Sequence, residues 1–215
     1  RYARIIFSLH ATAVAGIFLT LFYIIFQHYF EYHYAWSHSS KELPFKYLLS
    51  CFWEGQEGSF LLWTIWNGIL GWVAMRSAGK WEAPVMSILT AVQVFLASML
   101  LGLYFFNQPV GSDPFILLRE RMTGAPIFQQ ADYLEFVRNG NGLNPLLQNY
   151  WMVIHPPVLF LGFASTLLPF AYAVAALWKQ DYEDLVQPLL RWSLFSGAVL
   201  GTGIMMGGAW AYESL

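Results

Sequence analysis

The chain has 215 residues, of which 57% are hydrophobic and 11% are charged, whereas a soluble domain carries about 25% charged residues. This composition predicts a membrane protein, and a formal net charge of −2 without a basic cluster excludes a surface that tracks nucleic-acid phosphates. The single cysteine, Cys51, excludes an internal disulfide, a thiolate metal cluster and a CxxC redox pair within the chain.

Five long segments without Asp, Glu, Lys or Arg predict five transmembrane helices. A spanning helix needs about 20 apolar residues, and a membrane strand would alternate apolar with polar residues, which these segments do not. We expect the spans near residues 6–27, 58–76, 84–106, 156–177 and 191–211. The predicted fold is therefore all-α, a polytopic transmembrane helix bundle that forms a single membrane domain over residues 1–215. Short surface helices are expected in the external loops, residues 28–57 and 107–155.

The two ends of the sequence predict that this chain is the N-terminal part of a longer protein. It begins at Arg1 without a methionine and stops directly after "GGAWAYESL". The first apolar run is longer than the about 7–15 residues of a signal-peptide core and has no small-residue cleavage pattern before His28. We therefore expect the first span to be retained.

The first span contains one ionisable residue, His10, about one-third of the way along it. An ionisable group at membrane depth is a functional candidate by default. Ser8 and Thr12 supply polar neighbours, however, and they favour a neutral histidine that is hydrogen-bonded in the core.

The connections between the spans predict the orientation of the chain. Lys and Arg lie close to the helix ends on one side, and on the other side they are diluted over the two long loops. The positive-inside rule therefore places the first side in the cytoplasm and the long loops outside. The residues on the predicted cytoplasmic side are Arg1, Arg4, Arg76, Lys80, Lys179 and Arg191.

The fourth span is preceded by "NYWMVIHPP", in which His155 comes directly before Pro156 and Pro157. Proline is favoured in the first turn of a helix and pushes the residue before it out of helical geometry. We therefore expect the two prolines to mark the helix start, with Val158–Trp178 as the helix body. His155 would then lie at the external mouth of this span.

Two interpretations of His155 remain open on this local pattern. It could form an ordinary hydrogen bond at the membrane interface or cap a neighbouring helix end. It could also bind haem, because each axial position of the haem iron takes one neutral imidazole and the macrocycle is held by apolar walls.

The fifth span contains two pairs of glycines at helical spacing. Gly197 with Gly201, and Gly203 with Gly207, form two small-xxx-small pairs. Such pairs allow two helix backbones to approach closely, so close packing explains them without a cofactor.

Four blocks of the sequence resemble the CcmF/CcsA family of cytochrome c-type biogenesis proteins, and the CcmF branch more closely. They are "YAWSHSSKELPFKYLLSCFWEGQEGSFLLW" (34–63), "SDPFILL" (112–118), "GLNPLLQNYWMVIHPPVLFLGF" (142–163) and "GGAWAYESL" (207–215). Their order matches the family, and they are spread over about 180 residues, which makes the match more specific than any one motif.

The resemblance implies a role in cytochrome c maturation. The full-length protein would be a component of a haem lyase that holds haem outside the bacterial cytoplasmic (inner) membrane while apocytochrome c thiols add to the haem vinyl groups. The implied partners are the haem chaperone CcmE, apocytochrome c and other membrane subunits of cytochrome c maturation. The protein would contribute position and ligand field rather than a nucleophile.

The resemblance also implies site residues. His155 matches the histidine of the family's "HPP" motif and would be an axial ligand of the haem iron. Trp210 and Tyr212 open the tryptophan-rich segment that forms the external haem platform in the family. The second ligand of this haem, and both ligands of a second haem within the membrane, would map beyond Leu215.

One position departs from the family pattern. In "WEGQEGS", Gln56 stands where the family usually has a histidine, which puts in doubt any role there as a proton carrier or metal ligand. Two other functions stay open: a non-catalytic haem conduit or transporter, and a quinone-linked respiratory membrane subunit. A transporter would be expected to have broken helices, and a haem b carrier to have facing histidines on two spans.

Overall fold

The computed structural model describes residues 2–106 and 108–214. It confirms an all-α fold with five helices long and apolar enough to cross a membrane. These are α1 (Tyr2–Phe26), α4 (Gln56–Ser77), α5 (Glu82–Ser98), α8 (Tyr150–Lys179) and α9 (Val186–Ser214). The shorter elements are α2 (His33–His38), α3 (Phe45–Glu54), α6 (Leu118–Arg121), α7 (Tyr133–Phe136) and a hairpin of β1 (Leu103–Phe105) and β2 (Gln108–Val110).

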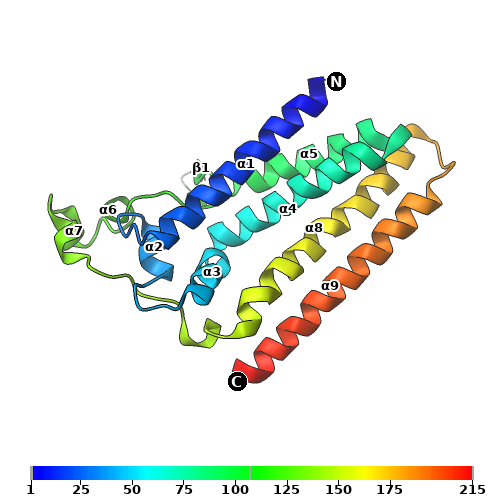
Figure 1. The fold of residues 1–215 in the computed structure, drawn as a ribbon. Helices are drawn as coiled ribbons and strands as arrows, with labels where there is room; N and C mark the ends of the chain where they lie inside the picture. Colours follow the sequence, from blue (N-terminus) through cyan, green and yellow to red (C-terminus); the bar gives the residue numbers. More distant parts are fainter. Residues whose placement is uncertain (1, 107, 215) are drawn as a thin grey trace.

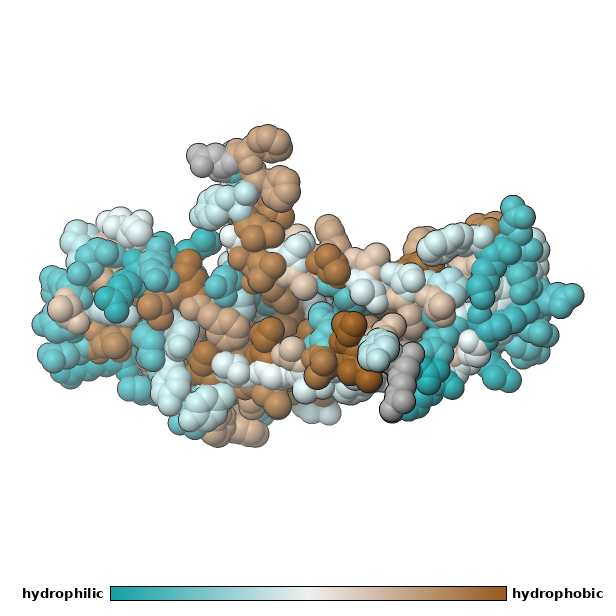
Figure 2. Space-filling view, turned by 90° about the horizontal axis from the view of Figure 1, so that it is seen from above, coloured by the Kyte–Doolittle hydropathy of each residue, from teal (hydrophilic) through white to brown (hydrophobic). Residues whose placement is uncertain are grey.

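The long helices lie side by side, with α4 and α5 between α1 and α8, and with α9 along the outer side of α8 (Figure 1). Short turns connect α4 to α5 and α8 to α9 at one end of the bundle, here called the turn end. The short helices and long connections gather at the other end, here called the loop end (Figure 1). Hydrophilic residues cover both ends and hydrophobic residues the middle (Figure 2), as expected for a body that spans a bilayer.

Most of the buried core belongs to two large clusters of side chains. Small residues of α8, including Ala164, Ala171 and Ala175, allow close packing against α4 and α5. The second cluster joins α1, α3 and α4 around larger side chains such as Leu21 and Phe52. Helix α9 adds only partly buried side chains, Leu189 and Trp192, to the first cluster. Its contacts are concentrated along α8, and most of its surface is exposed.

The third span is shorter than predicted. The expected span was 84–106, but α5 ends at Ser98. The chain then turns at Gly102, whose φ of +57° favours glycine, and residues 103–105 and 108–110 form the two strands of the antiparallel hairpin β1–β2. Apolar composition alone cannot separate a helix from a strand with the same side chains, so the prediction extended the helix too far.

The fourth span begins earlier than predicted. Helix α8 starts at Tyr150, where the Asn149 side chain accepts a hydrogen bond from the Trp151 N–H, so Pro156 lies inside the helix and not at its start. A proline at position 156 removes the N–H that would bind the carbonyl of Met152. The Trp53 indole donates to that carbonyl at 2.9 Å and replaces the missing bond. The neighbouring helix thus makes an interior proline tolerable.

Candidate functional site

His155 lies at the loop end of α8, about one and a half turns inside the helix. Its half-buried imidazole faces α9, where Nδ1 is 2.8 Å from the carbonyl oxygen of Gly203. A carbonyl oxygen only accepts, so Nδ1 carries the proton and donates it. In the neutral ring the lone pair then lies on the remaining nitrogen, Nε2, and no described residue forms a hydrogen bond with it.

Two glycines of α9 make room for this imidazole. A Cβ atom on Gly207 would lie 2.7 Å from Cε1 and 3.2 Å from Nε2 of His155, which is too close for a real side chain. A Cβ on Gly203 would lie 2.8 Å from the backbone of Leu159 on α8. The second small-xxx-small pair therefore forms the predicted close helix contact. The same contact leaves the space that the His155 ring occupies.

The first glycine pair does not form the predicted contact. Nothing described lies within 4 Å of a Cβ built on Gly197 or Gly201. These positions lie on a face of α9 turned away from α8. Glycine spacing identifies a helix surface with small residues, but it does not identify which of two such surfaces meets a neighbour.

Trp210 lies on the same side of α9 as Gly203 and Gly207, because positions 203, 207 and 210 repeat at helical spacing. Its indole N–H donates to the carbonyl of Leu146 at 3.1 Å, in the turn just before α8. The Ser214 hydroxyl also contacts this carbonyl, at 3.3 Å. Trp210 therefore fastens the end of α9 to the segment that leads into His155.

Tyr212 does not join this group. It is 88% exposed, and two positions along a helix rotate a side chain by about 200°, so it points away from the face that carries Trp210. The structure thus brings His155 together with Gly203 and Gly207, with Trp210 next to them along α9. It leaves Tyr212 on the outer surface.

Sequence reasoning missed two tryptophans that donate hydrogen bonds to backbone carbonyls on either side of His155. Besides the bond from Trp53 to Met152, the Trp66 indole donates to the carbonyl of Pro157 at 3.0 Å. Both tryptophans lie in or next to α4 and hold the proline-containing turn of α8 in place. For Trp53 the signal was present in the sequence, because a proline at position 156 leaves the Met152 carbonyl without its helical N–H donor. The bond from Trp66 has no such signal, because neither proline removes the helical donor to the Pro157 carbonyl.

His10, within α1, has a different environment. The side-chain amide of Gln93 on α5 donates to Nε2 of His10 at 3.2 Å, and the same amide donates to the carbonyl of Thr64 at 3.2 Å. Gln93 is 1% exposed. The structure therefore agrees with a hydrogen-bonded histidine in the core, although its partner is Gln93 and not the expected neighbours Ser8 and Thr12.

The "WEGQEG" block packs against α2. A Cβ atom on Gly55 would collide with the ring of Tyr34, and one on Gly58 would collide with the carbonyl of Phe52, to which the Tyr34 hydroxyl donates at 2.7 Å. Burial raises the pKa of the Tyr34 hydroxyl well above its usual value. Gln56 is exposed at the start of α4, so the departure from the family pattern falls on a surface position.

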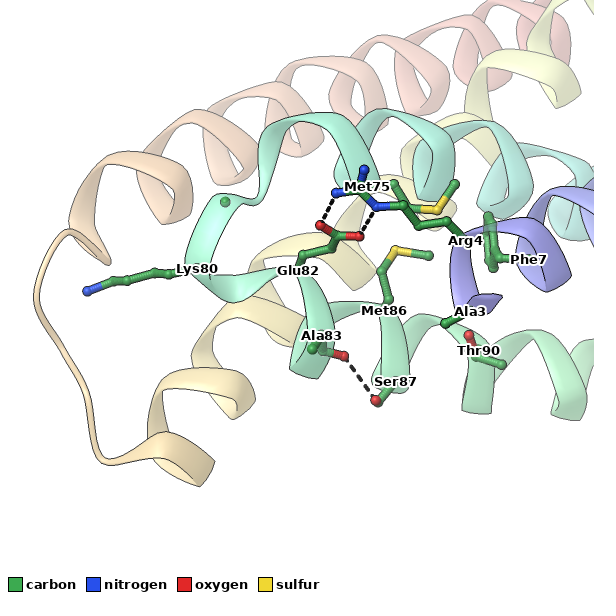
Figure 3. A pocket seen from close by; sticks show the side chains of 11 residues that line it. Ala3, Arg4, Phe7, Met75, Lys80, Glu82, Ala83, Met86, Ser87 and Thr90 are labelled. Carbon is green, nitrogen blue, oxygen red and sulfur yellow. Dashed lines mark hydrogen bonds and ion pairs between the residues drawn. The ribbon is translucent and has the colours of Figure 1, made fainter. Parts of the chain in front are cut away.

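A cavity of about 830 Å³ lies at the turn end, far from His155 along the bundle. Arg4 pairs with Glu82 across it, whereas Lys80 points away from the cavity (Figure 3). Lys80 instead lies 3.0 Å from Asp181 in the turn between α8 and α9. None of the predicted site residues lines this cavity.

The described residues contain no group of three or more His, Cys, Asp or Glu side chains placed to hold a metal ion. The donor set at His155 is thus one imidazole whose Nε2 has no hydrogen-bond partner among the described residues. This set fits a haem iron, which takes one imidazole on each side, better than it fits a free metal ion. A ligating histidine commonly donates its other N–H to a backbone carbonyl, as Nδ1 of His155 does.

Comparisons with known proteins agree with the resemblance in the sequence. Residues 53–215 match the family described as Cytochrome C assembly protein. The chain is 32% identical to cytochrome c-type biogenesis protein CcmF of Pseudomonas fluorescens over 187 residues, which are 86% of this chain and 26% of that protein. It is 30% identical to CcmF of Escherichia coli K12 over 208 residues, 94% of this chain and 29% of that protein.

A similar relationship links the chain to a protein of another name. Cytochrome c-type biogenesis protein NrfE of Haemophilus influenzae is 27% identical over 215 residues, 98% of this chain and 30% of that protein. The chain therefore spans between a quarter and a third of the length of these relatives. No solved structure matches it.

Proposed function

Because the chain belongs to the Cytochrome C assembly protein family, and to its CcmF type, we propose that it serves cytochrome c maturation by presenting one axial ligand to a haem. The observation that carries this proposal is the hydrogen bond from Nδ1 of His155 to Gly203, because it leaves Nε2 free. The chain spans only part of its relatives, so the activity belongs to the full-length protein.

Haem, when bound, supplies two things: an iron that the imidazole can ligate, and vinyl groups that become thioether links. The residues of this chain position it. Gly203 holds the proton on Nδ1 of His155, and the absent side chain of Gly207 keeps the ring in its place. Such fixing of a ligand before binding lowers the entropy cost of the complex. The second ligand would come from a part of the full-length protein that this chain does not include.

Trp210 and Tyr212 have separate roles in this proposal. Trp210 keeps α9 in register with α8 through its bond to Leu146. Tyr212 is exposed on the other side of α9, where its ring can contact haem only if the remainder of the full-length protein brings the macrocycle to that face. His155 and Trp210 are thus the residues that the arrangement supports more directly.

The proposed surroundings follow from the same family. The location is the bacterial inner membrane, with the loop end on the periplasmic side, as the distribution of Lys and Arg favours. The proposed partners are the haem chaperone CcmE as the source of haem, apocytochrome c as its acceptor, and other membrane subunits of cytochrome c maturation.

A cell-based assay with matched histidine variants tests the proposal. A bacterium that lacks its own gene for this protein would receive the full-length gene, either unchanged, as His155→Ala or as His10→Ala. We expect covalently bound haem in c-type cytochromes to be lost with His155→Ala and kept with His10→Ala, at equal protein levels in the membrane. Cytochromes that mature normally with His155→Ala would reject the ligand role of His155.

The same assay separates the proposal from a haem conduit. A conduit would also need His155, but its loss would reduce haem outside the membrane before any attachment step. Haem bound to CcmE is the quantity that distinguishes them. With His155→Ala it should remain at or above its normal level if the defect lies in attachment, and it should fall if the protein conducts haem.

A further inference from the structure

The hairpin that follows α5 projects from the helix bundle. Its strands β1 and β2 pair antiparallel, and the Ser112 N–H donates to the carbonyl of Met99 at 2.9 Å, which closes its base. Gly111 at this base has a φ of +75° and approaches the Met99 backbone. Figure 2 shows the hairpin as an apolar projection that extends sideways from the body, at the top of the view.

The surface of this projection is apolar and aromatic. Tyr104 is 74% exposed, Phe105 is 61% exposed and Phe106 is 97% exposed. Residues 99–111 contain no Asp, Glu, Lys, Arg or His. Large exposed aromatic side chains in a segment without charge would be costly in water, so they indicate a contact with something apolar.

The position of the hairpin along the bundle indicates what that contact is. Helix α5 has 17 residues and is about 25 Å long, somewhat less than the roughly 30 Å of a hydrocarbon core. The hairpin therefore begins near the boundary between acyl chains and headgroups. It cannot lie deep in the core, because the outer edges of a two-stranded ribbon carry unpaired backbone groups that need water or headgroups.

The apolar surface of the hairpin continues a surface of α5. Val94 is 65% exposed and Phe95 is 62% exposed on that helix, and Leu101 in the turn that follows is 63% exposed. In a spanning helix such side chains contact lipid. The exposed apolar surface thus runs from the membrane-spanning part of α5 into the hairpin, with no charged side chain between them.

We propose that the β1–β2 hairpin is a lipid-binding element that lies along the bilayer interface at the loop end. The ring of Phe106 enters the upper acyl region, while the strand backbone stays at headgroup level, as aromatic side chains do at membrane interfaces. The hairpin then sets the depth of the loop that follows. That loop is joined to α2 through the His33 N–H, which donates to the carbonyl of Ile116 at 3.0 Å.

Spin labelling of the full-length protein in phosphatidylcholine and phosphatidylglycerol vesicles tests this proposal. A single cysteine would be introduced as Phe106→Cys, with Cys51 and any others replaced by alanine. Collision with oxygen, which enters lipid, would be compared with collision with an aqueous nickel chelate. Val94→Cys is the control for a lipid-facing site, and Leu134→Cys, in α7, is the control for a site in water.

We expect the ratio of oxygen to nickel collisions at position 106 to be several-fold higher than at position 134 and lower than at position 94. A ratio equal to that of position 134 would place the hairpin in water and overturn the proposal. Protection from both reagents would also overturn it, because it would show that protein covers the hairpin. A second label, Phe105→Cys, guards against a local change in fold at position 106.

Discussion

Two long helices of this protein each carry one histidine inside the bundle, and the two differ in which nitrogen is used. In α1, Nε2 of His10 accepts a hydrogen bond from Gln93, so its lone pair is occupied. In α8, Nδ1 of His155 donates to Gly203 and Nε2 remains available. A histidine within a transmembrane helix is therefore not a ligand by position alone. Both sets of neighbours favour the proton on Nδ1, so what decides whether the histidine can bind an iron is whether the lone pair of Nε2 is already occupied.

The two histidines also differ in what surrounds the ring. His10 contacts a side chain, whereas His155 contacts backbone and fills the space next to Gly207 that a side chain would otherwise occupy. Side-chain partners can rotate when a variant is made, but a helix carbonyl cannot. The position of the His155 ring should therefore be sensitive to a single methyl group on α9. A change at His10 should mainly lower the stability of the protein.

The largest effect is expected from Gly207→Ala. The added methyl would lie 2.7 Å from Cε1 of His155, so the ring must rotate and its bond to Gly203 is lost. Loss of such a supporting contact typically weakens metal binding about 10- to 100-fold. Haem titration of the purified full-length protein, followed by its absorption spectrum, measures this loss.

Gly208→Ala is the matched control for that variant. It adds the same methyl one residue further along α9, where nothing described lies within 4 Å. Its haem affinity should equal that of the unchanged protein. Equal haem affinities for Gly207→Ala and Gly208→Ala would contradict the claim that contact with Gly203 and Gly207 positions His155.

A smaller effect, and one on stability, is expected from His10→Ala. The variant leaves one N–H of the buried Gln93 amide without an acceptor, which costs roughly 1–3 kcal/mol. Denaturant unfolding in detergent measures the change, and the double variant with Gln93→Leu should recover part of it. If His10→Ala removed haem without changing stability, the contrast between the two histidines would fail.

Trp210→Phe should have a smaller effect still. It removes the indole bond to Leu146 while keeping an aromatic ring, and a hydrogen bond of this kind contributes about 1 kcal/mol. We expect thermal unfolding at a slightly lower temperature and a modest loss of haem affinity, because α9 is less firmly fastened to the turn before α8. A Trp210→Phe protein with normal stability and a complete loss of haem would instead indicate direct contact of the indole with haem.

The smallest effect is expected at the turn end, from Asp181→Asn. The hydrogen bond from Lys80 lowers the pKa of the Asp181 carboxyl. A lowered pKa means that the folded state binds the proton less strongly, so this contact stabilises the protein above the ordinary carboxyl pKa of about 4. The stabilisation disappears as the pH falls through the lowered value. Unfolding temperatures of the two proteins should therefore differ near neutral pH and converge in acid, with no change in haem binding.

The sequence predicted the helix bundle because charge-free segments of spanning length have few other solutions in a membrane. It also indicated His155 as a candidate haem ligand, which stays a prediction, but it placed this residue before the helix and not within it. The reason is that the rule for prolines describes an isolated helix. The bond from Trp53 to Met152 comes from a segment about 100 residues away in the sequence, and no local pattern contains it.

The end of α5, and the choice of which glycine pair on α9 contacts α8, were harder to predict for related reasons. Residues 99–106 are as apolar as the helix before them, and only the turn at Gly102 separates the two. Gly197 with Gly201 has the same spacing as Gly203 with Gly207, yet only the second pair meets α8. Which face of α9 is buried depends on tertiary packing and not on the spacing itself.

The spectrum of haem bound to full-length His155→Ala tests the central claim most directly. The purified variant would be compared with the unchanged protein by visible absorption and electron paramagnetic resonance, with and without added imidazole. If Nε2 of His155 is an axial ligand, the variant should lose one low-spin haem signal, and imidazole should restore it by filling the vacated space. An unchanged haem content and signal in His155→Ala would contradict the account.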